Sequence, residues 1–354
     1  MCRLFLSIGG TIDITIHEAA NDRMVQEAVS ASGGPWGGIN VDKQYTQILA
    51  EVFGTDFMNR LKLDHPNTWL NMLIDFETKK RGAKPGRTAG ISMTISFQFA
   101  KLFEQYTGEK LEDRIKKRES LGVKFRNGML GVSGDALRNM YAEVIENIRT
   151  HLRQLLQEVN GKQPSRMFIV GGFAGSAYLQ EFFTAEFDRY MKILVPEEAG
   201  MCVMKGAVLF GHDSKYISSR ISRFNYGLLK DIPFRKSKHD ENRKFVKDGR
   251  EWIKVLKTLV PKGQTLNVSD IVSSTTTFRD GLEIVPITLM CTEIDTENPH
   301  HPSTTLLEVI VVTNPNTETK RRKITTSLQF GGTDIAMKVV DHDTGKEIQS
   351  TVQF

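Results

Sequence analysis

The chain has 354 residues, 40% of them hydrophobic and 25% charged, with a formal net charge of +5 at pH 7 and three cysteines. This length gives room for two domains with separate cores. The mild charge argues against a nucleic-acid-binding domain, the short apolar runs against a membrane span, and the few cysteines against a disulfide framework. The composition therefore predicts a cytoplasmic protein of ordinary globular type.

Residues 4–18 predict a β-hairpin that turns at Gly9 and Gly10. The second strand alternates apolar and polar residues, which is typical of a half-buried strand. Glycines in the turn would let backbone N–H groups approach phosphate oxygens, because no Cβ stands in the way. An ordinary hairpin explains the pattern equally well.

A glycine-rich loop is predicted over residues 30–42, where Asp42 is expected to cap the next helix. The pattern is then helical to about Gly82. Glu77, Lys80 and Arg81 lie at i, i+3 and i+4 near its end, so they share one helix face. A solvated face with an internal ion pair is the simplest interpretation of such a trio.

The alternation from Ile91 to Phe99 predicts a strand, followed by a charged helix over 101–119 and a hairpin over 123–132. Ser133 or Asp135 is expected to cap a long helix. Apolar residues repeat at helical spacing along it: Leu137, Tyr141, Val144, Ile148, Leu152 and Leu155.

Residues 167–183 predict a short buried strand, a break at Gly171 and Gly172, and a helix from about Ser176. A strand, a glycine turn and a helix bring backbone N–H groups and a helix N-terminus to one point, which suits an anionic or ribose-phosphate ligand. A plain connecting turn is the alternative. A second small-residue helix follows, in which Gly206 and Ala207 would allow close packing and Cys202 is expected to be a core thiol.

The rest of the chain is predicted to be rich in β-structure. Charge is dense over 230–257, which predicts an exposed connection, and proteases are expected to cut between about Gly211 and Val246. The run Lys320–Lys323 is either a partner site or protection of an edge strand. Strands are expected at 284–291, 305–313, 324–330, 334–340 and 347–354.

The hairpin, the Glu77 trio and the Gly171 turn resemble, in order and separation, the second lobe of an actin-like (ribonuclease H-like) ATPase domain. More closely, they resemble the 70-kDa heat shock protein family, and residues 31–42 and the C-terminal region are similar to its divergent 12A/12B branch. The resemblance implies an α/β fold: a nucleotide-binding lobe over 1–211 with an inserted subdomain about 43–132, then a β-rich, atypical substrate-binding-like module over 212–354. It also implies that a first lobe is lacking.

In that family the lobe binds ATP or ADP, so the resemblance implies an adenine-nucleotide site. The first hairpin and the glycine-rich loop would meet the phosphates, the trio would hold ribose and adenine, and a planar guanidinium suits stacking on the base. No catalytic or metal-ligand residue is implied in this chain. The residues implied in binding are Gly9, Gly10, Thr11, Asp13, Gly33, Gly34, Glu77, Lys80, Arg81, Gly171 and Gly172.

Several positions depart from the family pattern. Leu6 stands where an Asp would hold Mg²⁺ through water, Ile8 where the first glycine would be, Lys84 in place of a serine, and Gly175 in place of a second adenine-stacking arginine. The first phosphate loop and the lysine of the first lobe have no counterpart. We therefore expect weak ATP/ADP binding, Mg²⁺ at most together with the nucleotide, and little or no hydrolysis.

Three functions remain open at this point. The first is a nucleotide-dependent, chaperone-like protein of the stress response, with protein partners or clients at the C-terminal module. The second is a non-catalytic adaptor or regulatory protein that keeps the fold. The third is a sugar or acetate kinase of the same fold, which would need a substrate pocket between two lobes.

Overall fold

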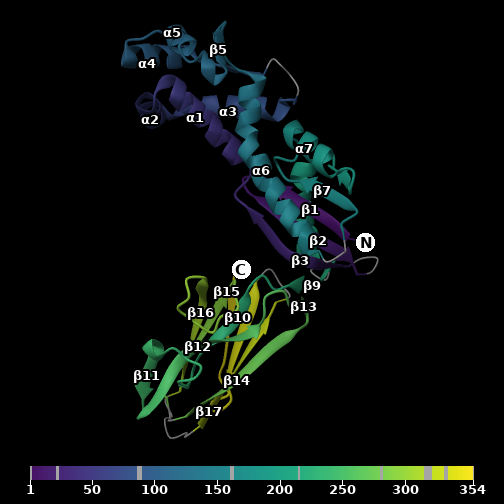
Figure 1. The fold of residues 1–354 in the computed structure, drawn as a ribbon, viewed down its shortest axis with the longest axis vertical. Helices are drawn as coiled ribbons and strands as arrows, with labels where there is room; N and C mark the ends of the chain where they lie inside the picture. The colour runs from purple at the N-terminus through teal and green to yellow at the C-terminus, as the bar shows by residue number, and fades with distance from the viewer. Residues whose placement is uncertain are drawn as a thin grey trace. The chain divides into compact units, whose positions relative to one another are not determined.

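The computed structural model describes residues 2–20, 24–85, 90–159, 163–213, 216–279, 282–314, 321–330 and 334–353 (Figure 1). The chain forms two compact units, one of Met1–His17 with Ser32–Leu209 and one of Glu18–Ala31 with Phe210–Phe354. Helices and several sheets are both present, so the predicted mixed α/β class is confirmed.

Five strands are neighbours in one sheet, in the order β3-β2-β1-β7-β8. They are β1 (Cys2–Ile8), β2 (Ile12–Ala19), β3 (Val25–Gly34), β7 (Arg166–Val170) and β8 (Lys192–Leu194). Strand β7 runs parallel to both β1 and β8. Ser7 pairs with Val170, so β1 and β7 end at the same edge. The alternation predicted for the second strand is confirmed, because Ile12, Ile14 and Ile16 of β2 are buried. Leu4, Leu6 and Ile8 of β1 are buried as well.

Helices α6 and α7 accompany this sheet. The predicted helix is α6 (Gly134–Glu158), capped by Ser133, whose Oγ accepts from the Ala136 N–H. Its predicted apolar residues are all buried. His151 of α6 lies 3.0 Å from the Ser32 hydroxyl of β3, so α6 runs over the sheet. Helix α7 (Ala177–Phe187) follows β7 and packs on α6.

Three helices, and not one, occupy residues 38–82: α1 (Gly38–Phe53), α2 (Thr55–Asp64) and α3 (Pro66–Gly82). Gly54, at φ +93°, separates the first two, and Pro66 starts the third. Helix α1 begins at Gly38, so the prediction of Asp42 as an N-cap is wrong. The Asp42 carboxylate instead forms an ion pair with Lys80 of α3.

The predicted strand Ile91–Phe99 is wrong in its second half. Strand β4 (Ile91–Thr94) stops because Ser96 caps α4 (Phe97–Thr107) by accepting from the Phe99 N–H. The predicted charged helix is α4 followed by α5 (Leu111–Lys116), with left-handed Gly108 between them. The predicted hairpin, β5 (Val123–Arg126) and β6 (Met129–Val132), is confirmed and joins β4 in a small sheet.

Helix α8 (Cys202–His212) is more exposed than expected. All of its residues, which belong to the described range 163–213, are at least partly exposed, and Val208 is 69% exposed. Cys202 is half-buried with its Sγ 3.5 Å from the Glu198 carbonyl, so the prediction of a core thiol is wrong. A Cβ added at Gly206 meets no described atom within 4 Å, so that glycine serves no close packing here.

The second unit is made of strands. They are β9 (Ile217–Ile221), β10 (Asn225–Pro233), β11 (Lys244–Lys247), β12 (Arg250–Val260), β13 (Thr265–Asn267), β14 (Ile271–Arg279), β15 (Ile284–Thr292), β16 (Thr304–Thr313), β17 (Arg321–Gln329), β18 (Ile335–Asp341) and β19 (Glu347–Val352). A 3₁₀ turn lies at Glu241–Arg243 in this unit, and two others lie in the first unit at Glu119–Leu121 and Ala199–Met201.

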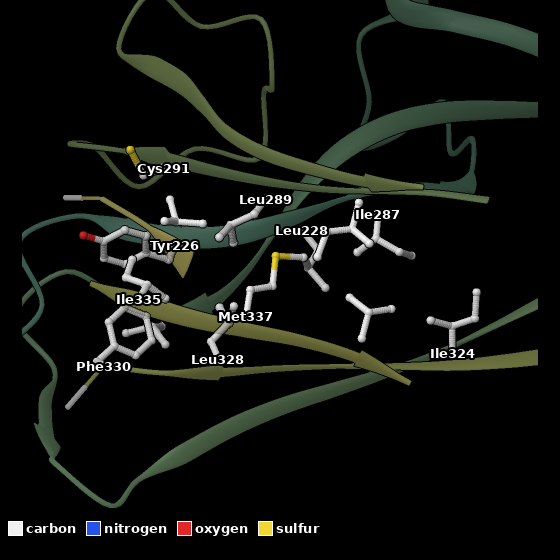
Figure 2. Packing of buried hydrophobic residues seen from close by; sticks show 14 of the residues in the cluster. Tyr226, Leu228, Ile287, Leu289, Cys291, Ile324, Leu328, Phe330, Ile335 and Met337 are labelled. Atoms are coloured by element: carbon white, nitrogen blue, oxygen red, sulfur yellow. The ribbon is translucent and has the colours of Figure 1, made fainter. Parts of the chain in front are cut away.

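Two sheets of this unit face one another, with orders β11-β12-β10-β15-β16 and β14-β17-β18-β19. Figure 2 shows their inner faces meeting around Tyr226, Leu289, Leu328 and Met337, all of which are buried. The strands expected from residue 284 onward are present. The prediction of an exposed connection over 230–257 is partly wrong, because β10 and β12 pair along their length inside the five-stranded sheet.

The basic run at 320–323 contains a core residue. Arg322 is 2% exposed, and its Nε and Nη2 donate to Asp341 Oδ2 at 3.0 and 2.9 Å. The guanidinium also donates to the carbonyls of Leu282 and Val312. The prediction that this run is a partner site or edge protection is therefore wrong for Arg322, whereas Lys320 lies outside the described residues.

Limited proteolysis is expected to begin between β10 and β11. There the chain leaves the sheet, and the side chains of Lys236 and Lys238 are 86% and 60% exposed. Trypsin followed by mass spectrometry should therefore find the first cut at 235–238. First cuts inside β10 or β12 would contradict the strand assignment.

None of the helices in the described ranges is both long and apolar enough to cross a membrane.

Candidate functional site

Both predicted glycine turns lie at the end of strand β1. The first turn consists of Gly9, Gly10 and Thr11 and is closed by a hydrogen bond of 2.8 Å from the Gly9 N–H to the Thr11 carbonyl. In the second turn, Gly171 has φ +95°, and an added Cβ would come within 2.5 Å of the Ile8 carbonyl oxygen. The Phe173 N–H donates to that oxygen at 2.9 Å. Ligands of open α/β sheets bind at such an edge, beyond the carboxyl ends of parallel strands.

The glycines that touch the first turn are Gly37 and Gly38. The Gly38 N–H donates to the Gly9 carbonyl at 2.8 Å, and a Cβ on Gly37 would overlap the backbone of Gly9 and Gly10. Gly33 and Gly34 lie earlier, at the end of β3, where a Cβ on Gly33 would overlap the Ile12 carbonyl. Sequence reasoning missed Gly37 and Gly38, although a second Gly-Gly pair directly before a helical pattern was the available signal.

The N-terminus of α1 adjoins the first turn. Gly37 takes the N-cap position, and because it has no side chain the helix is capped by backbone alone. The first four N–H groups of a helix lack intrahelical partners and carry the positive end of the helix dipole. Helix α1 is 16 residues long, and its start beside Gly9 makes this corner suitable for an anion.

Lys80 lies under this corner, where α3 crosses α1. Its side chain is 2% exposed, and its Nζ lies 2.6 Å from Asp42 Oδ1 and 3.3 Å from the Gly38 carbonyl. Glu77 is its second ion-pair partner. Burial raises the pKa of Asp42 against the opposing effect of Lys80. Burial would also raise the pKa of Glu77, but hydrogen bonds from Lys80 and Arg81 outweigh it and lower that pKa.

Arg81 is the accessible member of the trio. Its side chain is 66% exposed, and its Nε donates to Glu77 Oε1 at 2.8 Å. A guanidinium held at one edge by a carboxylate keeps a planar face that can stack on an aromatic ring.

Aromatic rings join the end of α3 to the second turn. Tyr141 of α6 stacks on Tyr178 with ring centroids 4.5 Å apart, and Phe173 lies 5.9 Å away. The Tyr141 hydroxyl donates to the Lys80 carbonyl at 3.5 Å. The predicted trio and the Gly171 turn are therefore brought together, as the sequence order suggested.

An open groove of about 560 Å³ runs between the end of α3 and α7. Lys84 and Pro85 line one side of it, and Gln180 and Glu181 the other. Gly175 is exposed, and an added Cβ meets no described atom within 4 Å. One side of the groove is thus lined by residues that follow α3, whose last turn contains the accessible Arg81.

The donor set fits a phosphate better than a metal ion. Leu6 is fully buried and has no oxygen to offer, while Asp13 is exposed and accepts from the Thr11 hydroxyl at 3.5 Å. Among the residues that the structure describes, no group of three His, Cys, Asp or Glu side chains is placed to hold a metal ion.

Comparison with known proteins gives three relatives and no match to a family model. The chain is 31% identical over 355 residues to heat shock 70 kDa protein 12A of Homo sapiens and to that of Mus musculus, and 29% identical over 361 residues to heat shock 70 kDa protein 12B of Homo sapiens. Each match covers 98% of this chain and 53% of the relative, so the chain spans about half the length of the curated relatives it matches.

A solved structure titled "pCBH ParM non-polymerisable quadruple mutant" matches 60% of this chain and 46% of its own, with a TM-score of 0.32 and 13% identity. That likeness is too low to assign a fold.

Proposed function

We propose that this chain, a homologue of heat shock 70 kDa proteins 12A and 12B, is a cytoplasmic, chaperone-like protein that binds ADP and ATP weakly and hydrolyses little or none. The predicted resemblance to the 12A/12B branch is confirmed by the relatives. One observation gives the strongest support for a nucleotide ligand. The backbone-capped start of α1 and two glycine turns converge at the end of parallel strands β1 and β7.

In this proposal the phosphates lie against the Gly9–Thr11 turn and the first turn of α1. Backbone N–H groups and the helix dipole favour negative charge there. Asp13 closes the far side of the turn, and Gly33 and Gly34 support it from β3. The ribose lies toward Glu77 and the Gly171–Gly172 turn, and Arg81 stacks on the adenine at the mouth of the open groove.

The affinity is expected to be low because the phosphates are held from one side only by the described residues. A dissociation constant in the tens of micromolar or poorer corresponds to about −6 kcal/mol. Phosphoryl transfer needs phosphates held from both sides, a bound Mg²⁺ and a positioned water. Buried Leu6 supplies no metal anchor, so turnover is expected at background.

Arg81→Ala tests the adenine site. We expect it to weaken ADP and ATP by similar factors, about tenfold, because the guanidinium stacks on the base and does not reach the γ-phosphate. Isothermal calorimetry measures both affinities, and a phosphate-release assay measures turnover. Arg153→Ala is the matched control, since Arg153 is an exposed arginine that is likewise paired with a glutamate, Glu186, and does not line the groove.

Unchanged affinity in Arg81→Ala would show that the adenine base does not bind at the end of α3. Turnover above background by the pure wild-type chain would overturn the non-hydrolysing part of the proposal.

The second candidate is a non-catalytic adaptor that acts through protein partners of the second unit. Strand β16 is the edge of its sheet, and Leu306, Val309 and Val311 are 55%, 42% and 48% exposed. An edge strand with apolar side chains suits an extended peptide or a partner strand. Absence of any calorimetric signal with ADP or ATP would favour this function.

A further inference from the structure

We infer that Lys80 serves the phosphate corner as a positioning residue: its ammonium fixes the start of α1, and through it the Gly9–Thr11 turn, without touching the ligand. This inference rests on the proposed nucleotide site. It differs from the ribose contact that the resemblance implies for this lysine.

The ammonium has no donor left for a ligand. A lysine ammonium carries three N–H donors. Here three acceptors surround it: Asp42 Oδ1 at 2.6 Å, the Gly38 carbonyl at 3.3 Å, and Glu77. The rings of Phe173 and Phe76 lie 5.4 and 5.8 Å from Nζ and close the remaining sides.

Gly38 carries the effect of Lys80 to the turn. Its carbonyl accepts from Lys80, and its N–H donates to the Gly9 carbonyl at 2.8 Å. One residue thus connects the buried charge directly to the phosphate-facing backbone. If the ammonium is removed, Gly38 loses its anchor and the first turn of α1 can shift away from Gly9.

The backbone of Lys80 reaches the second turn as well. Its carbonyl accepts from Tyr141, which stacks near Phe173, and the Phe173 N–H donates to the Ile8 carbonyl. Both turns at the end of β1 therefore depend on the placement of this one residue of α3.

Lys80→Met can keep the fold because the two carboxylates are not sealed in. Asp42 and Glu77 are 35% and 39% exposed, so each can turn to water when its partner is lost. Asp42→Asn provides a second, milder variant. Lys79→Met is the matched control, because Lys79 is an exposed neighbour on the same helix.

The experiment compares calorimetric affinities for ADP, 2′,3′-dideoxy-ADP and inorganic diphosphate. If Lys80 positions the turn, Lys80→Met weakens the binding of ADP and of diphosphate by the same factor. We expect about tenfold, the effect of losing one hydrogen bond between the displaced turn and a charged phosphate. The ratio of ADP to dideoxy-ADP affinity then stays as in the wild type. Asp42→Asn weakens the binding of ADP and of diphosphate by a smaller common factor, and Lys79→Met changes neither affinity. If Lys80→Met instead binds ADP and dideoxy-ADP equally well and keeps its diphosphate affinity, Lys80 contacts the ribose and the inference is overturned.

Hydrogen exchange separates this inference from the proposed function. We expect the Gly38 amide to exchange at least tenfold faster in Lys80→Met, while the amides of β7 keep their protection. If the wild type binds no nucleotide but Gly38 responds in this way, the proposed function fails and the positioning role stands. Unchanged exchange at Gly38 would overturn the positioning role whether or not nucleotide binds.

Discussion

Arg322→Met is expected to lower the free energy of unfolding of the second unit by about 3–5 kcal/mol, the usual result of breaking a buried ion pair. The change leaves Asp341, which is fully buried, without the guanidinium that donates two hydrogen bonds to its Oδ2. It also removes the hydrogen bonds that the guanidinium donates to the carbonyls of Leu282 and Val312. Chemical denaturation followed by circular dichroism measures the loss.

Arg321→Met is the matched control, because Arg321 precedes Arg322 in β17 and its side chain is exposed. A surface substitution of this kind changes the free energy of unfolding by about 0.5 kcal/mol or less. Equal effects of the two variants would mean that the buried pair adds nothing to the stability of the unit.

The same pair makes unfolding sensitive to acid. Burial alone would raise the pKa of Asp341, but hydrogen bonds from Arg322, the Asp343 N–H and Thr344 outweigh it and lower that pKa. A carboxylate with a lowered folded-state pKa adds stability above its unfolded-state pKa of about 3.9. That stability is lost as the pH falls through the folded-state pKa. Asp341→Asn should therefore unfold with a shallower dependence on pH below about 4 than the wild type.

Residues whose neighbours in sequence decide their structure could be predicted. The alternation in β2, the Asn127-Gly128 turn and the apolar repeat of α6 are each local signals in the sequence. Asn127 and Gly128 have φ +52° and +75°, which only a few residue types adopt easily, so this hairpin is strongly encoded. The error at Ile91–Phe99 is also local, because the capping strength of Ser96 overrides an alternating pattern that continues past it.

Residues that depend on partners far along the chain could not be predicted. Arg322 and Lys80 look like surface charges in sequence, yet each is 2% exposed, because a carboxylate from another element meets it. The sequence shows the Gly37-Gly38 pair but not the contact that these glycines make. Their role follows from the Gly9 backbone, which lies more than two dozen residues away in sequence. The elements that carry the proposed site were thus predicted separately, while the contacts that join those elements became visible only in the structure.

Gly37→Ala is expected to destabilise the first unit by about 1–3 kcal/mol and to abolish measurable nucleotide binding. A Cβ at this position would overlap the carbonyl groups of Gly9 and Gly10, which are backbone atoms and cannot rotate away. Its own backbone, at φ −104°, suits any residue, so the cost is one of space and not of conformation. The turn and the start of α1 must separate to make room, which removes the corner proposed for the phosphates.

Two further alanine variants make this test specific. An added Cβ at Gly9 and one at Gly82 both meet no described atom within 4 Å, so both variants should be about as stable as the wild type. Only Gly9 lies in the proposed phosphate corner, where its Cβ would occupy the space that a phosphate oxygen needs. Thermal denaturation should therefore single out Gly37→Ala, whereas calorimetry with ADP should show weakened binding for both Gly37→Ala and Gly9→Ala but not for Gly82→Ala. Wild-type affinity in Gly9→Ala would show that the phosphates do not bind at this turn. Wild-type stability in Gly37→Ala would show that the close approach of α1 to the turn is not required for folding.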